Sequence, residues 1–307
     1  MQAKDGQKLA STRPERGSSA PGWCSGWQTL LKGEPVDACS SQWKFVHSSA
    51  AGKSSGYAGG MTPQPSALLS RLARAEAAGH ARYGVVGAAA RFGPLVAVSA
   101  GPGLPVNTAW HDGSGPPTEA DLIAFEAFSA AHGQPAVLHL LSHAAPTLLP
   151  RLRSRGYTLA TVLHVYTHGL TSLPPEPALE IREEPDVTVW AALSAQGFGP
   201  GTGRIMRLVG QAPGTRRLVA RVDGQPAATA ALSLQNGVAA LHGSSTLPEF
   251  RGRGAQMALL AARLRQAAAA GADLASVFVT PGSASERNVC RAGFGLAGMR
   301  LTFTQED

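Results

Sequence analysis

From residue 61 onward, stretches whose apolar residues recur with a helical period alternate with short apolar runs that suit strands. Thr118, with Asp121 three residues later, forms a capping-box pattern, and Asp223-Gly224 marks a hairpin turn. The alternation predicts an α/β fold with a mixed sheet. Helices are predicted over 66–79, 118–131, 146–155, 185–196, 203–210, 255–270 and 282–293, strands over 85–92, 95–100, 136–141, 157–168, 217–222, 227–234, 238–246 and 274–280, and a loop over 101–117.

The predicted elements form two similar series on either side of a proline-rich segment, residues 173–177. In each series a short helix leads through a glycine into an aromatic residue. The corner at Arg155-Gly156-Tyr157 has the same form as the corner at Ala292-Gly293-Phe294. We therefore predict two halves in tandem, 61–172 and 178–307, joined by the linker 173–177.

Residues 1–60 differ in composition from the rest of the chain. They hold all five lysines and three of the five tryptophans, with Ser/Gly-rich stretches and no sustained period of 3.6 or 2. Such a segment buries too little apolar surface to offset its ordering entropy, so we expect a disordered leader. Its composition also raises the hypothesis that the natural chain starts at Met61, with a flexible native tail as the alternative.

The most informative stretch joins the predicted strand 238–246 to the predicted helix 255–270. Gly252 and Gly254 allow the backbone to approach a ligand closely, and the first N–H groups of a helix have no partner within it. A glycine-rich turn that leads into a helix is suited to a phosphate or pyrophosphate. An ordinary turn with solvated arginines is the alternative for Arg251 and Arg253. The strand 274–280 and the short helix 282–293 that follow favour a binding site.

Together these elements resemble the acetyl-CoA site of the GNAT superfamily of N-acetyltransferases. The pattern of that family is Arg/Gln-x-x-Gly-x-Gly/Ala on the turn, followed by a downstream Asn and a Gly-Phe pair. Arg251 and Gly254 match it, whereas Gln256 stands where Gly or Ala is usual. The resemblance covers residues 178–305. It implies two GNAT-like domains in tandem, of which the first, 61–172, is degenerate because it has no such turn.

The resemblance also implies how this chain would bind acetyl-CoA. Backbone N–H groups at Thr246 and Leu247, where the strand splays from its neighbour, would meet the acetyl carbonyl. Ser285 and Asn288 would contact the pantetheine or the nearby backbone, with a helix cap as the alternative role. The pyrophosphate would be held by the turn and the helix start, at Arg251, Gly252, Arg253, Gly254, Ala255 and Gln256.

The general acid and base are open at this stage. Many members of the family place a Tyr four residues before the Gly-Phe pair, and Val289 occupies that position here, followed by Cys290. A thiol could donate the proton, although a Cys on a helix is more often simply packed. His242 and Glu249 are the nearest candidates for the base, with a structural role for the His and an ordered water as alternatives. Strand alternation predicts one common face for His242, Ser244 and Thr246.

Charge and cysteine content narrow the class of protein. From Met61 onward 20 Arg stand against 16 Asp and Glu, spread along the chain and not interleaved with aromatic residues, so we expect no nucleic-acid partner. The three cysteines show neither disulfide nor metal spacing, which suggests a reducing compartment and no metal. No apolar run is long enough to span a membrane, and Met1–Arg16 has no signal-peptide core, so we expect a cytoplasmic protein without a membrane partner.

Two functions from different classes fit these observations. The first is an N-acetyltransferase that moves an acetyl group from acetyl-CoA to an amine of a small molecule or peptide. The second is a catalytically inactive CoA-binding module, because the usual Tyr is missing and one half is degenerate. Acidic residues before the helix at 185–196 either favour a cationic amine or complement the helix dipole. They are Glu180, Glu183, Glu184 and Asp186.

Overall fold

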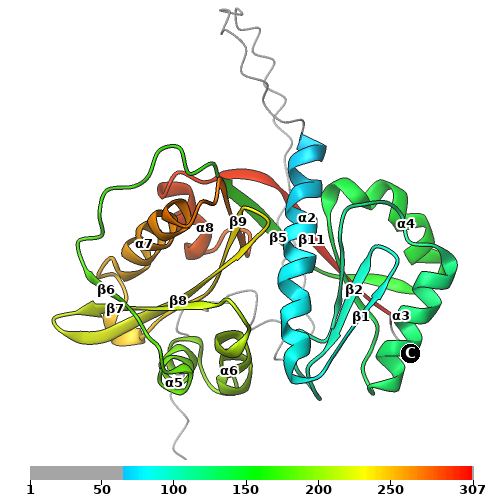
Figure 1. Ribbon diagram of the computed structural model, residues 1–307, viewed down its shortest axis with the longest axis horizontal. Helices are drawn as coiled ribbons and strands as arrows, with labels where there is room; N and C mark the ends of the chain where they lie inside the picture. The colour runs from blue at the N-terminus through cyan, green and yellow to red at the C-terminus, as the bar shows by residue number, and fades with distance from the viewer. Residues whose placement is uncertain (1–64, 306–307) are drawn as a thin grey trace, which may run out of the picture.

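A computed structural model describes residues 65–305, and the predicted leader, 1–60, lies outside the described residues. The described chain forms one mixed sheet of 11 strands in the order β1-β2-β3-β4-β11-β5-β10-β9-β8-β7-β6 (Figure 1). The α/β fold with a mixed sheet is thus confirmed. The elements are α2 (Pro65–Ala81), η1 (Arg82–Val86), β1 (Ala88–Phe92), β2 (Leu95–Ser99), β3 (Ala109–His111), α3 (Glu119–Ala131), β4 (Val137–Leu141), η2 (Ser142–Ala144), α4 (Ala145–Ser154), β5 (Tyr157–His168), β6 (Glu180–Glu183), α5 (Val187–Phe198), α6 (Gly203–Gln211), β7 (Arg216–Val222), β8 (Gln225–Gln235), β9 (Val238–Thr246), η3 (Pro248–Phe250), α7 (Ala255–Ala269), β10 (Leu274–Val279), α8 (Ala284–Arg291) and β11 (Gly295–Gln305).

The sheet is pseudo-symmetric about its central pair, β5 and β11. These two long strands pair antiparallel from Tyr157 and Gln305 at one end to Thr167 and Gly295 at the other. Beside them, β4 pairs antiparallel with β11 and β10 pairs antiparallel with β5. Each half therefore places its last strand next to a strand of the other half. The tandem halves share one continuous sheet rather than forming two separate ones.

Helices cover both faces of the sheet, and the hydrophobic clusters assign each helix to a face. On β5, Val165 packs with residues of α2, whereas the adjacent Tyr166 packs with residues of α7 and α8. On β2, Val96 packs with α2 and its neighbours Leu95 and Ala97 pack with α3 and α4. Successive residues of a strand point to opposite faces, so α2 lies opposite α3, α4, α7 and α8. Helices α5 and α6 lie on the same face as α2, which stands between the halves (Figure 1).

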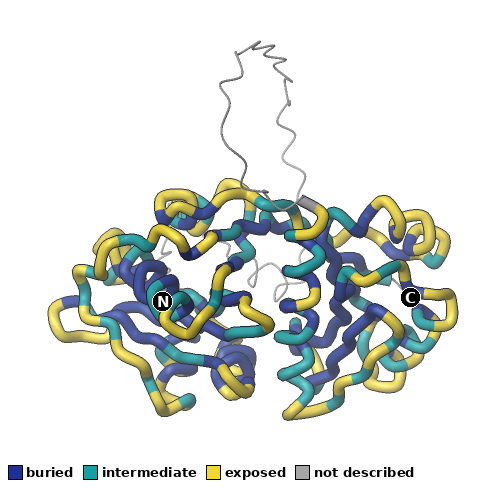
Figure 2. Tube along the Cα trace, turned by 45° about the horizontal axis from the view of Figure 1, so that its top comes forward, coloured by how far each residue is buried: buried dark blue, intermediate teal, exposed yellow. Residues whose placement is uncertain are grey.

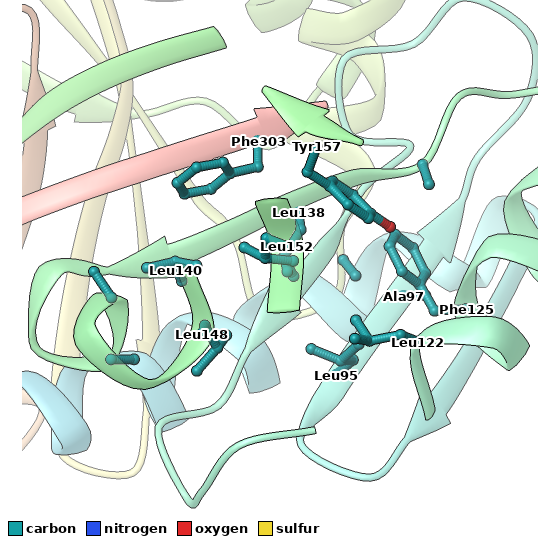
Figure 3. Packing of buried hydrophobic residues seen from close by; sticks show 14 residues of the cluster. Leu95, Ala97, Leu122, Phe125, Leu138, Leu140, Leu148, Leu152, Tyr157 and Phe303 are labelled. Atoms are coloured by element: carbon teal, nitrogen blue, oxygen red, sulfur yellow. The ribbon is translucent and has the colours of Figure 1, made fainter. Parts of the chain in front are cut away.

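The exchange of strands also builds the core of the first half. Leu122 and Phe125 of α3 pack with Leu148 of α4, and Phe303 of β11 joins them from the far end of the chain (Figure 3). A fully buried Phe contributes roughly 1.5–3 kcal/mol, so the C-terminal strand is part of the stability of the first half. The tube in Figure 2 shows the buried residues following the strands through both halves.

The predicted elements are found with small shifts at their ends, whereas β6 and β11 have no predicted counterpart. Three further differences stand out. The predicted loop 101–117 contains β3, whose three residues pair with β2 and β4. The start of the predicted strand 85–92 is a 3-10 turn, η1. Glu180 and Glu183 lie on β6 and pair with Arg182 and Arg216, so they are not helix-start charges. In residues 65–305 no helix is long and apolar enough to cross a membrane.

Candidate active site

The turn between β9 and α7 leaves a row of backbone N–H groups open. Gly252 and Gly254 have φ angles of 77° and 80°, in the left-handed region that favours glycine. Gly254 is the N-cap of α7 and makes no side-chain cap, and in the described chain no protein acceptor binds the N–H groups from Gly252 to Gln256. A Cβ built on either glycine meets no atom within 4 Å. The helix start is therefore free to bind an anion.

The matching corner of the first half is closed by its own side chains. Thr118 and Asp121 form a capping box at the start of α3. In the loop before them, Asp112 accepts a hydrogen bond from the Ser114 N–H at 2.9 Å, and His111 Nδ1 accepts one from the Gly113 N–H at 3.1 Å. Several of the donors that a phosphate could use are thus already occupied. The first half also lacks the glycine-rich turn.

Strands β9 and β10 separate near the open turn. They pair in parallel only from Val238 to Ala240 on β9 and from Leu274 to Ser276 on β10. Beyond these residues both strands continue without pairing to each other. The ladder ends on the side where α7 begins, so the ends of β9 and β10 near the turn are not joined to each other by ladder hydrogen bonds.

A β-bulge lies on β9 beside this opening. The ladder to β8 shifts register between Thr229 and Ala231, which leaves Gly243 and Ser244 opposite a single residue. Gly243 adopts a φ of 60°, and a Cβ there would come within 3.3 Å of the Trp190 ring. The bulge therefore depends on glycine, and it leaves backbone groups unpaired where the strands separate.

The bulge reverses the side-chain alternation that we predicted from the sequence. The common face expected for His242, Ser244 and Thr246 is wrong, because the extra residue places His242 and Thr246 on opposite faces. The His242 Nε2 atom lies 3.3 Å from the Ser233 hydroxyl, on the face of α2 and α5. The Thr246 hydroxyl accepts a hydrogen bond from Gln256 Nε2 at 2.7 Å, on the face of α7.

Three other sequence candidates have positions that limit their roles. The Leu247 N–H donates to the Ala227 carbonyl at 2.9 Å, so the expectation that it meets an acetyl carbonyl is wrong for this structure. Arg253 donates to Asp223 at 2.6 Å, which leaves Arg251 as the exposed cation without an acidic partner within the described turn. Glu249 is exposed on η3.

Burial also limits His242 as a base. Burial, together with the charges of Arg82 and Arg263, lowers the pKa of His242 to about 3. An imidazole with such a low pKa stays neutral and binds a proton weakly, so it cannot hold the proton of an amine.

Helix α8 carries the remaining candidates. Ser283 caps it by accepting a hydrogen bond from the Glu286 N–H at 3.1 Å. Ser285 and Cys290 are exposed and Asn288 is half-buried, so all three can reach a ligand beside α8. Residues 65–305 contain no group of three or more His, Cys, Asp or Glu side chains able to hold a metal ion.

A hydroxyl that sequence reasoning missed lies beside these residues. Tyr166 of β5 donates to Glu286 at 3.0 Å, and His164 Nδ1 lies 2.5 Å from the same carboxylate oxygen. A hydrogen bond with Cys290, burial and the Glu286 carboxylate raise the pKa of Tyr166. Although burial opposes it, the bonds from His164, the Gly282 N–H and Tyr166 hold the pKa of Glu286 below its usual value. Tyr166 thus remains protonated next to an ionised carboxylate.

A second missed group lies on the opposite face, under α2. The Ser276 hydroxyl donates to Glu76 Oε1 at 3.1 Å, at the last residue of β10 that still pairs with β9. Burial raises the pKa of Glu76 to about 7, against the hydrogen bond from Ser276 and the charges of Arg300 and Arg82. A carboxylate with this pKa is a stronger base than an ordinary one and is still ionised in part at neutral pH.

Comparison with known proteins identifies the segment that holds the open turn. Residues 183–294 match the model of the Acetyltransferase (GNAT) family. This segment is a GNAT acetyltransferase domain. A comparison with curated proteins gives no match for the chain.

One solved structure shares the fold of the chain, and two others are similar to it at lower scores. A GCN5-related N-acetyltransferase from Kribbella flavida superposes with a TM-score of 0.64 at 21% identity, over 78% of this chain and 96% of the other. A tandem GNAT protein from the clavulanic acid biosynthesis pathway superposes with a TM-score of 0.49 at 14% identity, over 68% of this chain and 77% of the other. An acetyltransferase from the GNAT family of Colwellia psychrerythraea superposes with a TM-score of 0.45 at 14% identity, over 69% of this chain and 80% of the other.

The GNAT domain contains only part of the site. The open turn, the bulge on β9 and helix α8 lie within the matched segment. Tyr166 and Glu76 come from the first half, on β5 and α2, and Arg300 follows the segment on β11. Side chains of the first half therefore contact the matched segment, Tyr166 at Glu286 and Glu76 at Ser276.

Proposed function

We propose that the chain is an N-acetyltransferase that uses acetyl-CoA to acetylate an amine of a small molecule or peptide. The observation that carries the proposal is the uncapped start of α7 beside the opening between β9 and β10. The free N–H groups from Gly252 to Gln256 suit a pyrophosphate, and the exposed Arg251 adds positive charge. Ser285 and Asn288 on α8 would flank the pantetheine. Gln256 does not block this site, because its side chain is held by Thr246.

When bound, acetyl-CoA supplies a thioester, whose acetyl group passes to the amine nitrogen as the carbon–sulfur bond breaks. The unpaired backbone at Gly243 and Ser244 is the source of N–H groups for the carbonyl oxygen, in place of Leu247. Glu76 accepts the proton of the amine on the face of α2. The Tyr166 hydroxyl supplies a proton to the leaving sulfur on the face of α7 and α8, a role for which Cys290 is the neighbouring alternative.

Binding of the cofactor tests the first part of this proposal. In the full chain, Gly254→Ala places a side chain at the open helix start and strains the left-handed backbone, and Gly271→Ala is its control. Gly271 ends the same helix with the same φ of 80° and also has nothing within 4 Å of its Cβ. Both changes strain the backbone by about 1–2 kcal/mol. We expect only Gly254→Ala to weaken CoA binding in calorimetry, by at least about tenfold.

Turnover tests the second part. Release of free thiol from acetyl-CoA in the presence of amines is expected for the unmodified chain. Equal CoA affinity of the two glycine variants would overturn the cofactor site. Tight CoA binding without transfer to any amine would instead indicate a binding module that has no enzymatic activity.

A further inference from the structure

Arg300 is a half-buried cation whose guanidinium makes no hydrogen bond or ion pair in the described chain. It lies on β11, and its Nε atom is inaccessible to solvent and makes no hydrogen bond. No carboxylate of residues 65–305 lies within 4.0 Å of its guanidinium. Its central carbon lies 5.5 Å from the centre of the Phe278 ring and 6.0 Å from that of the Trp110 ring. Two aromatic rings thus hold the charged group in place while its N–H donors stay unused.

Two other arginines, Arg263 and Arg155, have partners where Arg300 has none. Arg263 is buried, and its guanidinium donates to the backbone carbonyls of Leu259 and Ala231 at 3.1 and 3.3 Å. Arg155 is paired with two carboxylates. Burial lowers the pKa of Arg300 to about 10, and the nearby Glu76 raises it only in part. Only the Nε atom of Arg300 is inaccessible, so the terminal N–H donors of the guanidinium are available to a bound anion.

The guanidinium lies on the side of the sheet from which an acceptor would reach the opening. Phe278 is two residues beyond Ser276, on the part of β10 that no longer pairs with β9. These two residues share a face of the strand, so the Phe278 ring and Arg300 lie on the same face as Glu76. That face is opposite α7 and α8, where the cofactor turn lies. The Glu76 carboxylate and the Arg300 guanidinium therefore lie on the same face of the sheet, beside the part of β10 that is not paired with β9.

We propose that Arg300 binds a carboxylate of the acceptor, so that the acceptor is an amine that also carries a carboxylate, of the amino-acid class. This inference rests on the proposed function. The planar guanidinium can bind both oxygens of a carboxylate at once, and the rings of Trp110 and Phe278 fix its orientation. The amine of the same molecule is directed to Glu76. The cofactor site does not depend on Arg300, whereas the charge of Arg300 helps to lower the pKa of Glu76.

Matched pairs of acceptors test the proposal with the full chain and saturating acetyl-CoA. Each pair is an amino acid and the amine that lacks its carboxylate: phenylalanine with phenethylamine, tyrosine with tyramine, and alanine with ethylamine. Phosphoethanolamine represents a phosphate in place of the carboxylate. We expect kcat/KM to be at least about tenfold higher for the amino acid of the pair that reacts best.

At a pH well above the pKa of Glu76, Arg300→Gln is expected to lower kcat/KM for that amino acid by about 10- to 100-fold and to change kcat/KM for its decarboxylated partner much less. Arg300→Lys keeps the charge and the aliphatic stem, so its loss is expected to be smaller than that of Arg300→Gln. It also serves as a second test if the Gln variant folds poorly. Arg265→Gln is the control, because Arg265 also has a buried, unpartnered Nε atom but lies on α7. A preference for the decarboxylated amines or for phosphoethanolamine would overturn the proposal, as would equal losses in the Arg265 variant.

A binding measurement separates this proposal from the proposed function. N-acetylphenylalanine and N-phenethylacetamide are titrated into the chain in the presence of CoA, where no transfer is needed. Stabilisation by the carboxylated compound alone, lost in Arg300→Gln, supports the subsite even if no amine is acetylated. Acetylation of amines without any preference for the carboxylated compound in either assay supports the enzyme and overturns the subsite. Binding of neither compound, without acetylation of any amino acid, overturns the subsite as well.

Discussion

The Tyr166 hydroxyl donates a hydrogen bond to Glu286 over 3.0 Å, and so joins the last strand of the first half to a helix of the second. The contact exists because β5 lies between β11 and β10 in the shared sheet. Helix α8 carries Val289 where many GNAT enzymes carry a Tyr, and the structure places a tyrosine hydroxyl beside α8 from another element. The degenerate half thereby supplies a group that the GNAT domain lacks.

Replacing Tyr166 by Phe is expected to lower kcat by about 10²-fold or more if the hydroxyl is the general acid. CoA binding should stay within about threefold of normal, because the hydroxyl is not needed to hold the cofactor. Tyr157→Phe is a matched control, since Tyr157 on the same strand also donates to a glutamate, Glu126, at 3.2 Å. Steady-state kinetics with the best amine would measure kcat for both variants. Similar losses in the two variants would show that the effect is structural.

The proposed base predicts a pH dependence of activity. Glu76 must be ionised to accept a proton, so kcat/KM is expected to rise with pH and level off above an apparent pKa of about 7. Glu76→Gln should lower kcat/KM by about 10²- to 10⁴-fold and remove this limb of the profile. Glu249→Gln is the comparison, because Glu249 is exposed on η3. An unchanged profile in Glu76→Gln would exclude this residue as the base.

The ionised form of Glu76 should also lower the free energy of unfolding at alkaline pH. Its pKa in the folded chain, about 7, lies above the value of an unfolded carboxyl, so the folded state binds more protons between these values. Stability therefore falls as the pH rises from about 4.5 to about 7 and stays reduced above it. At pH 8 the free energy of unfolding of Glu76→Gln, measured with urea, is expected to exceed that of the unmodified chain by about 1–3 kcal/mol. At pH 4.5 the two are expected to differ little. A loss of stability at pH 8 would contradict the assignment.

The strand exchange predicts that neither half folds alone. A fragment of residues 178–307 lacks β5 and exposes the edges of β10 and β11, which are open to aggregation. A fragment of residues 61–172 lacks β11 and the buried Phe303. We expect each fragment to be insoluble or unfolded when expressed singly, and the two together to form a soluble complex. Circular dichroism and size-exclusion chromatography would show this, and a stable, monomeric 178–307 fragment would contradict it.

The elements of the fold were largely readable from local patterns, as at Val238–Thr246, where predicted and observed strand coincide. The missed strand β3 has three residues inside a run of Gly and Pro, and its pairing with β2 and β4 makes it a strand. The bulge had a local sign, a glycine within a strand pattern, but its effect on the facing of His242 depends on the register with β8.

The site was predictable only where a single segment forms it. The turn at Arg251–Gly254 is continuous in sequence, so its glycines and helix start could be read directly. Pairing of β5 with β10 brings Tyr166 to Glu286, and packing of α2 on the sheet brings Glu76 to Ser276; no local pattern encodes either contact. Their chemistry also comes from burial and from neighbours such as Glu286 and Ser276, which depend on the folded chain.

The interleaving of β5 and β11 has a consequence for how this chain can change over evolution. A half that has closed its own phosphate corner with Thr118 and Asp121 would ordinarily be free to shrink or be deleted. Here deletion would remove β5 from between β11 and β10, so the loss of the first half would also disrupt the sheet of the second. The first half is thereby kept as a structural part of the second, and its surface remains open to acquire new roles.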